Sequence, residues 1–199
     1  MPTLLDPPLY STSLLESTDD IVKLGAHSFT SEPHLAIDGS TSKYNLYKPD
    51  WTNPAFIVSP KQTTIVQEIR VYASDERSKK DPREYKLEGR LSLSDDWTLI
   101  KEGTLPSLGS RNTKDLPIDE TTSYGKVSFP NTQPYNEYRL WFLSNRGNKS
   151  WIVASEVRFG GFYVYSQAPL PIPYPQHAVC SSDSECLSGM CSTTARVCD

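Results

Sequence analysis

The segment 64–89 carries the clearest alternation of apolar and polar residues in the chain. Ile65, Ile69 and Val71 fall on one face of a period-two pattern, which is typical of a half-buried β-strand. Tyr85 and Leu87 show the same alternation after a highly charged stretch, SDERSKKDPRE, at 74–84. The segment therefore predicts two strands joined by a long polar loop. Such loops in compact domains are usually functional or held by salt bridges.

Further short strands are predicted downstream. The strand-like stretches lie at 97–103, 126–129, 138–142, 156–159 and 162–165. No longer segment has the periodicity of an amphipathic helix. About eight short strands with long connections predict an all-β fold, an antiparallel β-sandwich of the jelly-roll kind. Trp97 and Trp141 lie on predicted strands and are expected in the core.

Composition supports this fold class and excludes some partners. The 199 residues suffice for one domain with appendages, and 16 prolines with 11 tyrosines favour β structure with many loops. A net charge of −4 argues against a nucleic-acid partner, because nucleic acids are held by basic surfaces. No apolar run is long enough for a membrane helix, and the N-terminus lacks a signal-peptide pattern. The sequence thus predicts a soluble protein without membrane insertion.

The chain divides by composition into four parts. Residues 1–19 predict an extended arm with two leucine pairs, which either covers an edge of the sandwich or docks on a neighbouring protein. Residues 20–165 are the predicted sandwich. Residues 166–178 contain alternating prolines and predict an extended linker. Residues 179–199 form a small cysteine-containing module.

This terminal module has the spacing C-x5-C-x4-C-x6-C, formed by Cys180, Cys186, Cys191 and Cys198. So short a segment cannot bury a core, so two disulfides are expected to hold it. Three pairings are open, and we favour 180–191 with 186–198. Zinc is the weaker alternative, because no C-x2-C pair is present. Disulfides indicate an oxidising compartment, although no secretory signal precedes them.

The stretch 36–44 contains Asp38-Gly39 flanked by Ser40 and Thr41. These residues predict a tight turn, because glycine tolerates positive φ and the polar side chains bond to nearby backbone. A turn of this kind also presents several oxygens to a hard cation such as calcium. Both interpretations remain open.

Several predicted loops carry side chains suited to a sugar. Sugar recognition needs an aromatic face for the ring and planar polar groups for the hydroxyls. The candidate ligand-binding residues are Tyr44, Tyr47, Trp51, Asn145, Arg146 and Trp151. Tyr47 and Trp51 lie in a polar stretch and are the aromatics most expected at the surface, whereas Trp151 has a second interpretation as a core residue.

Eight segments, taken in order, resemble the galactose-binding-like jelly roll of discoidin domains, coagulation-factor C domains and many carbohydrate-binding modules. They are AIDGSTSKY, PAFIVSP, TIVQEIRVYASD, KDPREYKLEGR, WTLIKEG, LPSLGSRN, YNEYRLWF and SEVRFGGF. The resemblance covers about residues 20–163. It implies a non-catalytic sandwich whose loops at one end are available for a ligand.

The resemblance also implies a structural calcium ion between the Asp-Gly loop and an acidic residue near the last strand. In this sequence the ligands would be Asp38, Ser40, Thr41 and Glu156. Lys43 departs from the family pattern, because a threonine ligand is usual at this place before the aromatic residue. Its ammonium group would compete with the ion.

A second departure lies in the loop 74–84, where Lys80 precedes Asp81 in place of the usual arginine. We expect a structural, salt-bridged role for Arg77, Asp81 and Arg83. Contacts of this loop with a ligand are the alternative.

The sequence offers little for catalysis. It has three histidines and none of the G-x-S-x-G, H-E-x-x-H or phosphate-loop motifs. Two non-catalytic functions remain. The first is a binding or adhesion module that recognises carbohydrate or another surface ligand, outside the cell or at its surface. The second is a structural subunit of a large assembly, such as a virus capsid or appendage, that contacts neighbouring subunits through its arm and terminal module.

Overall fold

The computed structural model describes residues 10–24, 32–47 and 54–164. The chain divides into two compact units, Met1–Tyr165 and Ser166–Asp199. The predicted linker, the cysteine module, Trp51 and the first nine residues of the arm lie outside the described residues.

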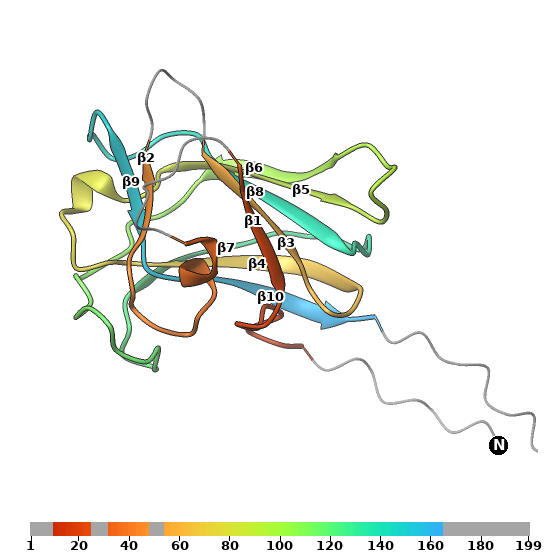
Figure 1. Cartoon of the computed structure of the whole chain (residues 1–199), viewed down its shortest axis with the longest axis horizontal. Helices are drawn as coiled ribbons and strands as arrows, with labels where there is room; N and C mark the ends of the chain where they lie inside the picture. The colour runs from red at the N-terminus through yellow and green to blue at the C-terminus, as the bar shows by residue number, and fades with distance from the viewer. Residues whose placement is uncertain (1–9, 25–31, 48–53, 165–199) are drawn as a thin grey trace, which may run out of the picture. The chain divides into compact units, whose positions relative to one another are not determined.

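The described residues form β-strands with two short 3-10 helices in the connections (Figure 1). The elements are β1 (Asp20–Leu24), η1 (Pro33–Ala36), β2 (Tyr44–Tyr47), β3 (Ala55–Ser59), β4 (Thr64–Tyr72), η2 (Ser78–Lys80), β5 (Glu84–Arg90), β6 (Thr98–Thr104), β7 (Tyr124–Ser128), β8 (Glu137–Phe142), β9 (Trp151–Ala154) and β10 (Val157–Tyr163). Neither helix in this part of the chain is long and apolar enough to cross a membrane.

The strands form three antiparallel sheets (Figure 1). The five-stranded sheet has the order β1-β3-β8-β5-β6, and the three-stranded sheet has the order β10-β4-β7. A separate ribbon pairs β2 with β9. The predicted all-β sandwich is confirmed.

The core lies between the two larger sheets. Each sheet contributes the residues on alternate positions of its strands, as the period-two geometry of a strand requires. The largest buried side chains include Phe56, Leu87, Tyr138, Phe142, Ile69 and Phe159. The rings of Tyr138 and Phe159 meet edge to face with centroids 5.5 Å apart, so an aromatic contact joins the two layers.

A β-bulge interrupts the pairing of β4 with β10. Val66 pairs with Gly161 and Glu68 pairs with Gly160, which leaves Gln67 as an extra residue on β4. An extra residue moves every following side chain to the other face of the sheet.

The bulge corrects one prediction about β4. Ile69 and Val71 face the core as predicted, but before the bulge it is Val66 that is fully buried, and Ile65 is only half-buried. Gly161 makes the close approach of the strands possible. Its φ is 154°, and a Cβ there would lie 2.0 Å from the carbonyl oxygen of Ile65.

The described part of the arm belongs to the sandwich. Ser11 exchanges two backbone hydrogen bonds with Gly161, of 2.7 and 2.9 Å, and the N–H of Leu14 donates to Phe159. Leu14 and Leu15 are buried in the core. Residues 11–15 therefore cover the open edge of β10, the first of the two alternatives for the arm.

Trp97 and Trp141 are not in the core, which corrects the prediction. On β8, Tyr138, Leu140 and Phe142 face the core. Trp141 alternates with them and therefore lies on the outer face of the sheet. The guanidinium of Arg139 lies 4.4 Å from the ring centroid of Trp97 and 5.1 Å from that of Trp141. Arg90 also lies 4.4 Å from Trp97, and the Lys86 ammonium lies 5.5 Å from Trp141. Cation–π contacts thus cover these rings.

Glu88 completes this outer network. Its carboxylate accepts hydrogen bonds from Arg139 Nε at 2.7 Å and Trp141 Nε1 at 2.8 Å, and Lys86 pairs with it at 3.0 Å. Burial opposes ionisation, but these donors together lower the pKa of Glu88. The tryptophans are therefore held by charged neighbours on a sheet face rather than by apolar packing.

Replacing Leu14 with alanine should destabilise the fold by about 2 to 4 kcal/mol, because the substitution opens a cavity in the core. Urea denaturation of the full chain followed by tryptophan fluorescence measures the change. Leu99→Ala is the matched control, since Leu99 is half exposed and its truncation should cost well under about 1 kcal/mol. Equal, small losses in both variants would mean that the arm is not part of the core.

Candidate functional site

Three long connections meet at one end of the sandwich. They are 73–83 between β4 and β5, 105–123 between β6 and β7, and 143–150 between β8 and β9. Strand β5 begins where its antiparallel neighbours β6 and β8 end, which brings the connections together. The N–H of Leu105 donates to Arg83 at 2.7 Å, and the N–H of Arg146 donates to Asp81 at 3.1 Å. The first connection thus binds the other two.

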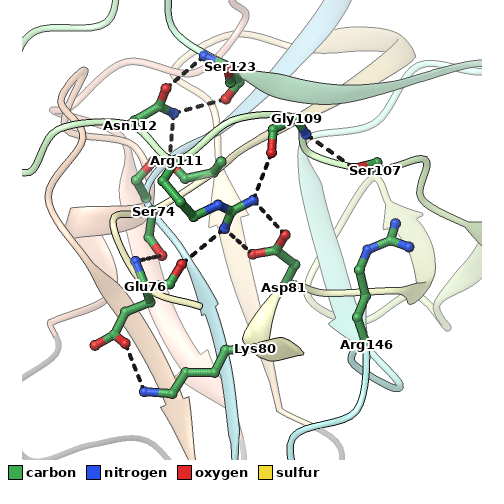
Figure 2. Close-up of polar contacts among 12 residues, drawn as sticks. Ser74, Glu76, Lys80, Asp81, Ser107, Gly109, Arg111, Asn112, Ser123 and Arg146 are labelled. Atoms are coloured by element: carbon green, nitrogen blue, oxygen red, sulfur yellow. Dashed lines mark hydrogen bonds and ion pairs between the residues drawn. The ribbon is translucent and has the colours of Figure 1, made fainter. Parts of the chain in front are cut away.

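An ion pair between Arg111 and Asp81 lies at the centre of this end (Figure 2). Arg111 Nη1 donates to Asp81 Oδ1 at 2.6 Å, and Nη2 donates to Oδ2 at 2.9 Å. The same guanidinium donates to the carbonyls of Glu76 at 3.3 Å and Gly109 at 3.1 Å. Such bidentate pairs combine strength with a fixed geometry.

Asp81 is nearly inaccessible to solvent, with 1% of its surface exposed. Burial raises the pKa of this carboxyl, and the hydrogen bonds and charge of Arg111 oppose that rise. Asp81 thus has the predicted salt-bridged role, but the prediction is wrong for Arg77 and Arg83, which are exposed and form no ion pair among the described residues. The partner is Arg111, 30 residues further along the chain.

Asn112 fastens the connection 105–123 to the sandwich (Figure 2). Its Nδ2 donates to the carbonyls of Ala73 at 2.6 Å and Ser123 at 2.9 Å, and its Oδ1 accepts from the N–H of Ser123 at 2.8 Å. Sequence reasoning missed both Arg111 and Asn112. They lie in the segment LPSLGSRN, whose only signal was its place in the family pattern.

Asn145 and Arg146, two predicted ligand residues, organise the connection 143–150. Asn145 Nδ2 donates to the carbonyls of Asn148 at 2.8 Å and Trp151 at 2.7 Å, and its Oδ1 accepts from the N–H of Gly147 at 3.0 Å. Arg146 is half-buried, and its Nη2 donates to the carbonyl oxygens of residues 105 and 106 at 2.7 and 2.5 Å. Among the described residues, its buried Nε has no partner.

The ribbon of β2 and β9 pairs the backbone of two predicted aromatic positions. Its register places Tyr47 directly opposite Trp151, and Trp151 is half-buried. The prediction that Tyr44 binds a ligand is wrong. Tyr44 is fully buried, with its ring edge-on to Phe56 at a centroid distance of 6.1 Å. It belongs to the core and cannot reach a ligand at the surface.

A pocket of about 430 Å³ opens beside the Asp81–Arg111 pair. Six of its eleven lining residues are serines or threonines, and Arg111, Asn112 and Asp119 add charged and amide groups. Leu116 and Pro117 supply the apolar part, and no aromatic residue lines the pocket. The pocket can exchange hydrogen bonds with a polar ligand but gives it no flat apolar face.

The predicted calcium ligands Asp38 and Glu156 lie at neighbouring places in the fold. Glu156 Oε2 accepts from the N–H of Gly39 at 3.1 Å, and Arg158 Nε lies 3.4 Å from Oε1. Burial raises the pKa of Glu156 to about 8. Both oxygens of this carboxyl are thus engaged by the chain itself.

The hydroxyl ligands of the predicted site are engaged as well. Thr41 Oγ1 donates to Thr113 and Leu116 carbonyls, and Ser40 Oγ donates to Ser42 Oγ at 2.7 Å. Calcium is coordinated by six to eight oxygens, and in this structure the side-chain oxygens of Glu156, Thr41 and Ser40 are hydrogen-bonded within the chain. Calcium binding stays a prediction that rests on the resemblance alone.

Lys43 does not occupy the predicted calcium site. Its ammonium lies 3.0 Å from Asp75 and 3.2 Å from Glu76, and these hydrogen bonds raise the pKa of Lys43. The side chain therefore links the Asp-Gly loop to the connection 73–83.

Replacing Arg111 with alanine should cost about 3 to 5 kcal/mol of folding stability, because it leaves the buried Asp81 carboxylate without its partner. Protonation of Asp81 removes the buried charge, so the penalty should shrink as the pH falls below the pKa of that carboxyl. Chemical denaturation at pH 7 and pH 4 checks both statements. Arg77→Ala, on the exposed side of the same loop, should have almost no effect. If Arg111→Ala lost no more folding stability than Arg77→Ala, Arg111 would not be the residue that stabilises the buried Asp81 carboxylate.

Comparison with known proteins identifies the fold. No protein-family model and no curated protein matches the sequence. Among solved structures, the family 32 carbohydrate-binding module of NanJ from Clostridium perfringens, in complex with galactose, is 14% identical with a TM-score of 0.57. That match covers 76% of this chain and 99% of the module.

Two further modules are similar. CpGH89CBM32-5 from Clostridium perfringens, in complex with GalNAc-β-1,3-galactose, is 13% identical with a TM-score of 0.56, over 74% of this chain and 99% of that one. The family 32 module of AlyQ, in complex with 4,5-unsaturated mannuronic acid, is 16% identical with a TM-score of 0.51. That match covers 70% of this chain and 92% of the module. The sandwich described above has the galactose-binding-like jelly-roll fold of these carbohydrate-binding modules.

Proposed function

We propose that this protein is a non-catalytic carbohydrate-binding module that recognises a glycan at the end of the sandwich where the three connections meet. One observation carries the proposal. The register of the β2–β9 ribbon sets Tyr47 opposite Trp151, next to the loop of Asn145 and Arg146. The shared fold supports it, because the similar modules are solved with galactose, GalNAc-galactose and a mannuronic acid derivative.

Trp151 is the residue that fits the apolar face of a sugar ring. It is half-buried, so part of the residue is open to solvent. Asn145 Nδ2 donates to its carbonyl, and Asn148 Oδ1 accepts from its N–H at 2.8 Å. These bonds fix the backbone of Trp151, so only its side-chain torsions remain to be ordered when a ligand stacks on the ring.

Planar polar groups stand near this aromatic position. Arg146 adjoins Asn145 in the same connection and is held by carbonyls of the connection 105–123. The hydroxyl-rich pocket begins in that connection. A glycan that stacks on Trp151 would have both groups of donors within one end of the fold, which suits its hydroxyls.

The competing function was a structural subunit of a virus particle, and the comparisons give it no support. The described half of the arm also packs on its own sandwich through Leu14 and Leu15, which removes part of the reason for an arm that docks on neighbours. A carbohydrate-binding module acts where glycans are displayed, so we place the protein outside the cell or at its surface.

A glycan array probed with the full chain should show binding to a defined group of glycans. Trp151→Ala should then weaken binding to the best glycan by about tenfold, because an aromatic stacking contact is worth roughly 1 to 1.5 kcal/mol. Isothermal titration calorimetry measures the affinity, and circular dichroism checks that the variant folds.

Trp97→Ala is the control, because Trp97 lies on the outer face of the five-stranded sheet under Arg90 and Arg139. It should leave the affinity within about twofold of the unchanged protein. An empty array would refute carbohydrate binding. Equal losses in the two variants would place the site elsewhere.

A further inference from the structure

Three cations lie in one row across the outer face of the three-stranded sheet. The register pairs Arg158 of β10 with Arg70 of β4, and Arg70 with Lys126 of β7. Neighbouring strands lie about 4.8 Å apart, so the row spans roughly 10 Å. Like charges directly opposite each other destabilise a sheet. We call Arg70, Lys126 and Arg158 the cationic row.

Two carboxyl groups pair with the row, each two residues before its arginine in the chain. Glu68 lies 2.6 Å from Arg70 and 3.7 Å from Lys126, and Glu156 lies 3.4 Å from Arg158. Their side chains are only 7% and 3% exposed, whereas Lys126 is 48% and Arg158 is 24% exposed. The two carboxyl groups are almost inaccessible to solvent and are outnumbered by the cations, so the exposed charge of this patch is positive although the chain as a whole carries −4.

Two tyrosines border the row. Tyr72 and Tyr124 are cross-strand partners whose ring centroids lie 5.0 Å apart. The guanidinium of Arg158 lies 5.5 Å from the Tyr72 ring, and that of Arg70 lies 5.3 Å from the Tyr124 ring. Tyr124 remains 37% exposed, so an aromatic surface adjoins the cations.

We propose that the cationic row and Tyr124 form a second binding surface, for an anionic polysaccharide that carries sulfate or carboxylate groups. Guanidinium and ammonium groups bind such anions through charge-assisted hydrogen bonds. A tyrosine ring offers a stacking face for the sugar between them. This surface lies on the outer face of the three-stranded sheet, whereas Trp151 of the proposed glycan site lies on the β2–β9 ribbon.

The features of the surface favour a polysaccharide over other polyanions. Three cations are too few to hold a nucleic acid on a chain of net negative charge. Membrane binding calls for a larger basic cluster, of about four to eight residues. A single sugar chain with regularly spaced anionic groups matches a short row with one open aromatic ring.

Dextran sulfate and unsulfated dextran test the proposal, because they share a backbone and differ in sulfate. The full chain should bind dextran sulfate, with an affinity that falls as salt rises, and should not bind dextran. Lys126→Glu should weaken the binding by about tenfold, and Lys126→Gln by less. Lys101→Glu is the matched control, an exposed lysine on β6 of the other sheet, and should stay within about twofold.

Three results would overturn the proposal. Equal binding of the two dextrans would exclude recognition of the anionic groups. Equal losses in Lys126→Glu and Lys101→Glu would mean diffuse attraction rather than a site. Binding to phosphatidylserine vesicles in place of dextran sulfate would assign the row to a membrane surface.

The measurement also separates this surface from the proposed glycan site. Lys126→Glu should leave the affinity for the glycan selected on the array unchanged. An empty array with intact dextran sulfate binding would refute the proposed glycan site alone.

Discussion

The burial of one carboxylate is the constraint on which the loop end depends. Asp81 is removed from water, and a buried charge of this kind is tolerated only with a well-placed partner. Arg111 supplies it and at the same time binds the carbonyls of Glu76 and Gly109. The backbone of Asp81 in turn accepts from Arg146. The ion pair thus joins two of the connections, and the backbone hydrogen bond to Asp81 holds the third, so the loop end acquires the rigidity that a binding site needs.

The two outer sheet faces use the same kinds of side chain with different results. Each face pairs three cations with two carboxyl groups. On the five-stranded sheet, the register sets Glu88 opposite Arg139 and Arg90 opposite Glu137. On the three-stranded sheet, it sets Arg70 opposite both Lys126 and Arg158. Strand register, and not composition, therefore decides whether a cation faces a carboxylate or another cation.

The fold could be predicted because its signals are local. Alternation along 84–90 and 137–142 and the order of the family segments depend on residues close in sequence. The errors arose where a segment far away in the sequence determines the position or the partner of a residue. The bulge at Gln67 comes from the pairing of β4 with β10, and the partner of Asp81 lies in another connection. For Trp141, alternation along β8 already indicated the outer face, and what lay far off in the sequence was Glu88, the partner of its indole N–H.

The candidate site was predictable as a set of residue types but not as an arrangement. Pairing of β2 with β9, over 100 residues apart, sets the backbone of Tyr47 opposite that of Trp151, and Tyr44 lies in the core. The aromatic position and the pocket would contribute differently to the free energy of binding. A hydrogen bond to a sugar hydroxyl replaces one to water and gains only about 0.5 to 1.5 kcal/mol. Burying the apolar face of a sugar on Trp151 has no such competitor. The tryptophan would therefore supply most of the affinity, and the hydroxyls of the pocket would select among sugars.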